Sequence, residues 1–127
     1  MTTGAILVAM HALLILWDLS AGSKVNADEL RTYIREESMA RFRQVEGLRQ
    51  KTWISNAETG AWGALYLFET KAQADEVVAH VMEGRVVQLT GLRPEVRRFE
   101  VEAVVEGRHS GLDLLASGLA LEDVPVE

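Results

Sequence analysis

The sequence has 127 residues, of which 48% are hydrophobic and 25% are charged, which is enough for one domain with one core but not for two. The formal net charge of -6, from 19 acidic and 13 basic residues, argues against nucleic acid as a partner, because an acidic surface repels phosphate. The absence of cysteine excludes disulfides, thiolate nucleophiles and cysteine-ligated metals. Because the sequence has no cysteine to form disulfides, nothing indicates secretion, and we expect a cytoplasmic protein.

An apolar run lies near the start of the chain. Residues 4–17 are shorter than the roughly 20 residues of a membrane helix, and no Lys or Arg precedes Lys24, as a signal peptide would require. We therefore expect no membrane partner and predict a buried strand over Ala5–Leu19. Apolar residues fill both of its alternating sets, which indicates a strand covered on both faces; periodicity alone also allows a buried helix.

The first helix is predicted to begin after Asn26, a favourable N-cap residue, with Asp28 and Glu29 in its first turn. Gly47 would end it. The apolar stripe of this helix, which also contains Arg41, is formed by Leu30, Ile34, Phe42 and Val45.

Two strands joined by a loop follow. Leu48–Ser55 predicts the second strand of the sheet, and Trp62–Phe68, rich in aromatic and aliphatic residues, predicts the third. The Gly-containing stretch Asn56–Gly60 between them is typical of a hairpin loop.

The second helix is predicted to begin after Thr70, because Gln73 stands three residues later at capping-box spacing. Gly84 weakens this helix, and Arg85–Leu89 could continue it. Its apolar face is formed by Ala74, Val77, Val78, Val81 and Met82.

The last part of the chain predicts a fourth strand over Glu95–Val105 and then a tail. Ser110 and Asp113 could start a short helix. We therefore divide the chain into one domain over residues 1–110 and a C-terminal tail over residues 111–127. The apolar side of the short helix would carry Leu112, Leu115 and Leu119.

The order β-α-β-β-α-β predicts a ferredoxin-like α+β fold, in which right-handed crossovers place both helices on one face of a four-stranded antiparallel sheet. The first and third predicted strands are apolar on both sides, yet the helices cover only one side. Because soluble monomers avoid large bare apolar patches, a second copy of the sheet is the simplest cover. The sequence therefore predicts a homodimer with its two sheets packed face to face.

Four short segments carry a resemblance to a known family: Gly47-Leu48, Lys51-Thr52-Trp53, Thr59-Gly60 and Gly63-Ala64-Leu65-Tyr66-Leu67-Phe68. In this order and spacing they resemble the YdhR-like mono-oxygenase family, over roughly residues 45–105. The resemblance implies the dimeric α+β barrel superfamily, which includes cofactor-free antibiotic-biosynthesis and quinol mono-oxygenases. The sequence departs from the family pattern at Glu46 and Gln50, and Arg85 lies two positions too far from His80 to match the family's helix-two histidine.

Motifs for bound cofactors are missing from the sequence. The three histidines, His11, His80 and His109, are isolated in different predicted elements, so we expect no metal site. No Gly-rich phosphate loop follows a strand and no Gly-x-Ser-x-Gly turn occurs. We therefore predict a protein without a cofactor and with a small hydrophobic or aromatic ligand.

The candidate catalytic residues are His11, as a general base near neutral pH, and Tyr66, as a hydrogen-bond donor to a substrate oxygen. Either could instead be a structural core or interface residue. The candidate substrate-binding residues are Trp53 and Arg41, with Trp17 and Trp62. The three tryptophans could instead fill the core, and Arg41 could instead be a surface residue whose stem lies along apolar side chains.

These residues suggest a cofactor-independent mono-oxygenase acting on a small aromatic, quinol or polyketide-like substrate, in which the substrate itself supplies electrons to dioxygen. A non-catalytic small-molecule-binding protein, and a cyclase or isomerase of a polyketide-like intermediate, would use the same pocket. The fold alone does not separate these three functions.

Overall fold

The computed structural model describes residues 9–122 and has four antiparallel strands in the spatial order β2-β3-β1-β4. The strands are β1 (His11–Asp18), β2 (Leu48–Asn56), β3 (Ala61–Phe68) and β4 (Glu95–Glu100). In every hydrogen-bonded pair the neighbouring strands run antiparallel. The predicted ferredoxin-like α+β fold is confirmed.

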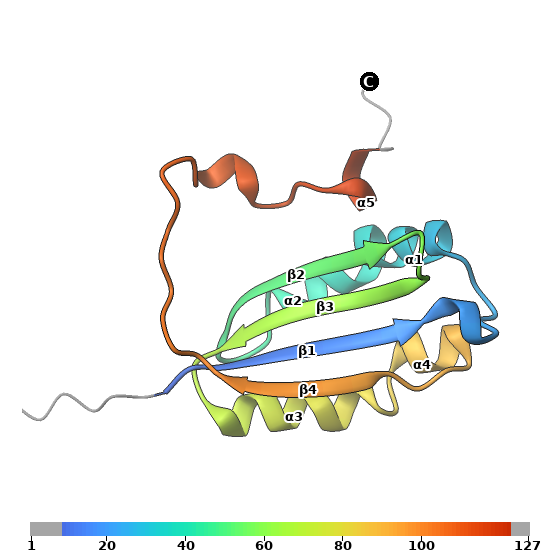
Figure 1. The fold of residues 1–127 in the computed structure, drawn as a ribbon, viewed down its shortest axis with the longest axis horizontal. Helices are drawn as coiled ribbons and strands as arrows, with labels where there is room; N and C mark the ends of the chain where they lie inside the picture. Colours follow the sequence, from blue (N-terminus) through green and yellow to red (C-terminus); the bar gives the residue numbers. More distant parts are fainter. Residues whose placement is uncertain (1–8, 123–127) are drawn as a thin grey trace, which may run out of the picture.

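The helices lie on one side of this sheet, behind the strands in the view of Figure 1. No helix within residues 9–122 is long and apolar enough to cross a membrane. The main helical elements are α1 (Ala27–Tyr33), a π-helical turn over Ile34–Ser38, α2 (Met39–Phe42), α3 (Lys71–Val81) and α4 (Arg85–Thr90).

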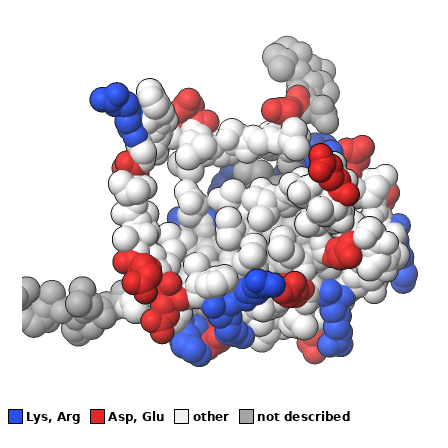
Figure 2. Space-filling view, viewed as in Figure 1, with Lys and Arg blue, Asp and Glu red and all other residues white. Residues whose placement is uncertain are grey.

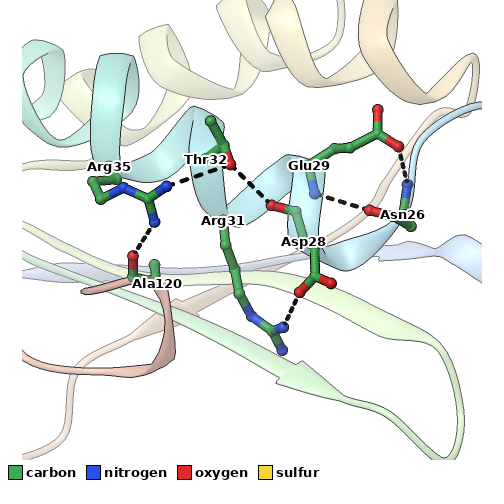
Figure 3. A network of polar contacts seen from close by, with 7 residues as sticks. All are labelled: Asn26, Asp28, Glu29, Arg31, Thr32, Arg35 and Ala120. Atoms are coloured by element: carbon green, nitrogen blue, oxygen red, sulfur yellow. Dashed lines mark hydrogen bonds and ion pairs between the residues drawn. The ribbon is translucent and has the colours of Figure 1, made fainter. Parts of the chain in front are cut away.

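The start of α1 is fixed by a reciprocal pair of hydrogen bonds. The Asn26 side chain accepts from the backbone N–H of Glu29 at 2.9 Å, and the Glu29 carboxylate accepts from the backbone N–H of Asn26 at 3.5 Å (Figure 3). This capping box satisfies two backbone donors that a helix end otherwise leaves unpaired. The predicted helix start is therefore confirmed.

The predicted second helix divides into two. The Thr70 hydroxyl accepts from the backbone N–H of Gln73 at 3.2 Å, so α3 begins where its cap was predicted. Gly84 adopts an extended conformation, with φ -87° and ψ -169°, and α4 begins after it as a separate helix. Arg85–Thr90 therefore does not continue α3, because the extended glycine turns the chain.

The first and the last of the four predicted strands are shorter in the structure. Of Ala5–Leu19, residues 5–8 lie outside the described residues, β1 begins at His11, and Leu19 starts a 3₁₀ turn. β4 ends at Glu100 instead of Val105, and Glu100 pairs with His11, the first residue of β1. The backbone N–H of Val101 still donates to the backbone oxygen of Met10 at 3.1 Å.

The core lies between the sheet and the helices. Side chains of β1 alternate between the two faces, so Leu13, Ile15 and Trp17 point together toward the helices and are buried. They pack with β3 and with the inner sides of α1 and α3. The remaining members of this cluster are Leu30, Ile34, Trp62, Ala64, Tyr66, Phe68, Ala74 and Val77.

The opposite face of the sheet is apolar and open within one chain. Leu65 of β3 is 45% exposed and Phe99 of β4 is 50% exposed. In Figure 2 uncharged side chains cover the middle of this face, and charged side chains gather along its lower edge, over β4. By strand alternation and register, the same face also carries Leu14, Leu16, Ile54 and Leu67.

The chain after β4 runs away from the sheet and returns beside α1 (Figure 1). It contains a 3₁₀ turn, Leu112–Leu114, where a short helix was predicted, and α5 (Leu119–Glu122). Arg35 of the π-helical turn donates to the backbone oxygen of Ala120 at 2.6 Å (Figure 3). Leu112 is 87% exposed, so this segment contributes little to the core. The division into residues 1–110 and 111–127 stays a prediction.

Candidate functional site

A cavity of about 80 Å³ lies between the sheet and the helices. Its walls come from β1, β2 and β3 on one side and from the ends of α1, α2, α3 and α4 on the other. Six aromatic rings contribute to the lining, which suits a flat apolar ligand. These rings belong to Trp17, Tyr33, Phe42, Trp53, Trp62 and Tyr66.

All predicted site residues except His11 line this cavity. Tyr66 and Trp62 stand on β3, Trp53 on β2 and Trp17 on β1, while Arg41 reaches it from α2. The helix-facing side of the sheet therefore collects these residues from separate parts of the chain.

His11 lies on the helix-facing side of β1 but outside the cavity. It lines a separate depression together with Lys71, Asp75 and Arg98. Within the sheet, His11 pairs with the fully buried Phe68, whereas Tyr66 pairs with Leu13, the next residue of β1 on the same face. The structure therefore does not bring His11 and Tyr66 into one site.

Tyr66 is buried, and its ring stacks on Phe68 with 6.1 Å between ring centroids. Its ring lies 5.8 Å from that of Phe42. Burial, together with the nearby Tyr33, raises the pKa of the Tyr66 hydroxyl well above its ordinary value of 10.0. The hydroxyl therefore stays protonated at physiological pH and can donate a hydrogen bond.

Lys51 is a functional candidate that the residue-by-residue analysis missed. It pairs with Tyr66 across β2 and β3, and its Nζ lies 3.2 Å from the ring centroid of Phe42. The same atom lies 4.4 Å from the centroid of Trp53 and 4.6 Å from that of Tyr66. The Lys-x-Trp alternation was a usable signal, because residues two apart on a strand share a face.

Two opposing effects act on the Lys51 amine. Burial, and secondarily the positive charge of Arg41, lower its pKa well below the ordinary value of 10.5. The three rings favour the ammonium form, by about 0.5–2 kcal/mol for each such contact. Removal of an ammonium ion from water costs several kcal/mol and acts against the charged form, and the net direction of the pKa shift is downward.

Two further polar groups border the cavity, one on α2 and one on the π-helical turn that precedes it. Arg41 donates to the Tyr33 hydroxyl at 3.4 Å. The Ser38 hydroxyl is buried without a hydrogen-bond partner among the described residues. Ser38 ends the π-helical turn, and such turns inside α-helices often occur at functional sites. An unpartnered buried hydroxyl is costly unless a ligand or water pairs with it.

Trp17 and Trp62 form one end wall. Their ring centroids are 5.9 Å apart, with the planes tilted by 56°. The Trp17 indole N–H donates to the backbone oxygen of Leu92 at 3.0 Å. Because this donor is already satisfied, Trp17 offers the cavity only its apolar ring surface.

Metal-binding clusters do not occur in the described part of the chain: residues 9–122 contain no group of three or more His, Asp or Glu side chains placed to hold an ion. The cavity offers rings and hydrogen-bond donors. That the protein works without a cofactor stays a prediction.

The profile of the family described as "Putative mono-oxygenase ydhR" matches residues 19–106. The chain belongs to this family. The match includes every cavity-lining residue except Trp17, and it confirms the resemblance seen in the short segments of β2 and β3. A search of curated proteins gave no match.

Solved structures of similar fold support the architecture. A protein of unknown function, NE2512 from Nitrosomonas europaea, has a TM-score of 0.57 at 12% identity, covering 79% of this chain and 96% of its own. The mono-oxygenase ActVA-Orf6 of Streptomyces coelicolor, solved with nanaomycin D, has a TM-score of 0.53 at 14% identity, covering 79% and 93%. At these identities the likeness concerns the fold.

Proposed function

We propose that this protein is a cofactor-independent mono-oxygenase that acts on a small aromatic, quinol or polyketide-like phenol. The observation that carries the proposal is the cavity itself, whose aromatic walls surround the protonated hydroxyl of Tyr66. Membership of a family described as mono-oxygenases supports the reaction type. The similarly folded ActVA-Orf6, a mono-oxygenase solved with nanaomycin D, supports an aromatic ligand.

The proposed reaction needs no external reductant. Loss of a phenolic proton makes the ring electron-rich enough to pass electrons to dioxygen. A ring C–H carbon conjugated with that oxygen becomes a carbonyl carbon, so that the phenol is oxidised to a quinone. One atom of dioxygen enters the new carbonyl, and the other leaves as water with the ring hydrogen and the phenolic proton. The protein has to bind the ring, stabilise the anion and exclude bulk water.

The cavity residues divide these tasks. Trp53 and Phe42 stand edge to face, with 6.2 Å between their centroids, and would hold the substrate ring. Tyr66 would donate to the substrate oxygen as negative charge develops, and Arg41 would balance that charge. His11 has no part in this scheme, because it lines a different depression.

The size of the cavity limits the ligand. Its volume of about 80 Å³ is below the roughly 150 Å³ of an engineered apolar cavity that binds benzene. Even a single ring therefore requires side chains to move aside. The Lys51 side chain, whose amine occupies the space between three rings, is the natural group to move. We therefore favour ligands of one or two rings.

We also propose that the protein is a homodimer joined through the open face of the sheet. Leu65 and Phe99 are half exposed at this face, and burying such a patch stabilises a symmetric interface. The exposed leucines of the tail, Leu112, Leu115 and Leu119, could extend the contact to the second copy.

Light scattering at micromolar concentration should give about twice the chain mass of 14.1 kDa. Leu65→Glu should shift the protein toward the monomer, whereas Ala72→Glu, on the exposed side of α3, should not. If the wild-type protein is a soluble monomer, the proposed dimer is wrong.

The proposed reaction is tested by a thermal-shift screen with quinols, flavonoids and polyketide-like phenols, followed by oxygen uptake on the compounds that stabilise the protein. Oxygen consumption matched by oxidised product is expected. Binding without oxygen uptake or product would indicate a non-catalytic binding protein. An isomeric or cyclised product formed without oxygen would indicate the cyclase or isomerase.

A further inference from the structure

The charges around the cavity are all of one sign. Its lining includes no Asp or Glu, although the chain has 19 acidic and 13 basic residues. The titratable or charged groups that border it, besides Lys51, are Tyr33 of α1, Arg41 of α2, Tyr66 of β3, His80 of α3 and Arg85 of α4.

The two cations nearest the rings have no carboxylate partner among the described residues. The ion pairs recorded for residues 9–122 include neither Lys51 nor Arg41. Arg85, at the far side of the cavity, lies 4.0 Å from Glu37, which lines a different depression. Arg41 is exposed and needs no partner, whereas Lys51 is half-buried among the rings. A cation that is partly removed from water is normally paired. The missing negative charge therefore points to a ligand.

The polar groups of the cavity also match an oxyanion. The Ser38 hydroxyl is buried and unpartnered, and the Tyr66 hydroxyl stays protonated. Arg41 offers a guanidinium that cannot lose its proton. These groups donate hydrogen bonds, and none is a carboxylate that would repel an anion. A phenolate or enolate oxygen would satisfy several of them at once.

We propose that Lys51 accepts the phenolic proton of the ligand and that, as an ammonium ion beside Arg41, it holds the phenolate that remains. The substrate class is then an acidic phenol or enol. In this step the O–H bond of the ligand breaks and an N–H bond forms on Nζ, so no oxidant or reductant is needed. The proposal rests on the proposed function for the later oxidation of the ring.

Three observations make Lys51 the acceptor. Burial and Arg41 lower its pKa, so the amine releases its proton more readily here than in water and can regain one beside a bound anion. It stands directly opposite Tyr66 on the neighbouring strand, so a single ligand oxygen can meet both side chains. His80, the other titratable base at the cavity, is exposed on α3.

The probe for the experiment is 4-nitrophenol, at a pH of about 8 where the free phenol is already mostly phenolate. Calorimetric titrations in two buffers of different ionisation enthalpy then measure the protons taken up on binding, which at this pH report protonation of the protein. Wild-type protein should take up a proton. Lys51→Arg should bind the anion without taking up a proton, because arginine is already charged.

Affinity provides a second readout. Lys51→Met should bind 4-nitrophenol about ten- to hundredfold more weakly, as expected for the loss of a charged hydrogen bond. Nitrobenzene, which has the same ring without an ionisable oxygen, should bind both proteins alike. Lys71→Met, which removes an exposed lysine of α3, is the matched control and should behave as wild type.

Several results would overturn the assignment: no binding of 4-nitrophenol at millimolar concentration, no proton uptake by the wild type, or unchanged affinity in Lys51→Met. Proton uptake lost in His80→Gln and kept in Lys51→Arg would move the role to His80. These binding measurements do not depend on oxygen, so they test the role of Lys51 separately from the proposed reaction.

If the wild type takes up a proton on binding but consumes no oxygen, only the proposed mono-oxygenase activity is contradicted. If Lys51→Met consumes oxygen as fast as the wild type, only the proposed role of Lys51 is contradicted.

Discussion

Across the strand order β2-β3-β1-β4, the two ends of the helix-facing side carry their charges in opposite arrangements. At the β4 end, which borders His11, the cations Lys71 and Arg98 share the carboxylate of Asp75, with Lys71 at 2.8 Å. At the β2 end, Lys51 lies against aromatic rings with Arg41 nearby, and no carboxylate lines their cavity.

Exposure explains why the first arrangement needs no ligand. Lys71, Asp75 and Arg98 are all substantially exposed, and ion pairs of this kind contribute little to stability because water and salt screen them. Lys51 is screened much less, so its charge has to be relieved by losing a proton or by gaining an anion. The unpaired end is therefore the better candidate for a binding site, although its histidine lies at the other end.

The largest expected effect concerns turnover. Tyr66→Phe should lower the rate of oxygen uptake about 10²–10³-fold, the usual result of removing one donor to a developing oxyanion. His11→Ala should leave the rate within about twofold of wild type, because His11 borders the paired end. Oxygen-electrode measurements on both variants decide. A large loss in His11→Ala would reverse the comparison between the two ends.

A smaller effect concerns stability. Lys51→Met should raise the free energy of unfolding by about 0.5–2 kcal/mol. The reason is that it removes a half-buried amine that is kept for function although it lowers the stability of the fold. Lys71→Met should change it by no more than about 0.5 kcal/mol. Urea denaturation of both variants measures these values. A clear loss of stability in Lys51→Met would mean that the contacts of the ammonium with the rings outweigh its burial.

The lowered pKa of Lys51 also predicts how the stability of the protein changes with pH. Because the pKa of Lys51 is lowered in the folded protein, the unfolded chain binds an extra proton between that folded pKa and 10.5. Stability therefore rises with pH through this window and falls again on acidification. Above pH 10 the raised pKa of Tyr66 acts in the opposite direction. Thermal unfolding of wild type and Lys51→Met below pH 10 should show the rise only in the wild type.

The smallest effect is expected at the paired end. The pKa of Asp75 is lowered chiefly by its hydrogen bond with Lys71, and further by Arg98. Its contribution to stability is therefore present above its ordinary pKa and is lost as the pH falls. Since these groups are exposed, Asp75→Asn should lower the melting temperature only slightly, and less in high salt. A large loss would show that this cluster is a structural anchor.

The order of the main helices and strands, and most of the predicted site residues that line the cavity, could be read from local patterns of residues. The caps at Asn26 and Thr70 act through local hydrogen bonds, and strand alternation alone sets which residues share a face. These short-range rules were enough to place the cavity-lining residues Trp53 and Tyr66 on neighbouring strands of one sheet.

Which of these residues lie together depends on how the helices pack on the sheet. His11 and Trp17 share a face of β1, yet they border different depressions, because the helices pack over different lengths of the strand. β4 ends at Glu100, which pairs with His11 at the start of β1. The lowered pKa of Lys51 required burial between the sheet and the helices, together with the charge of Arg41 on α2. Burial and charge proximity arise between elements far apart in the chain, so no local pattern of residues encodes them.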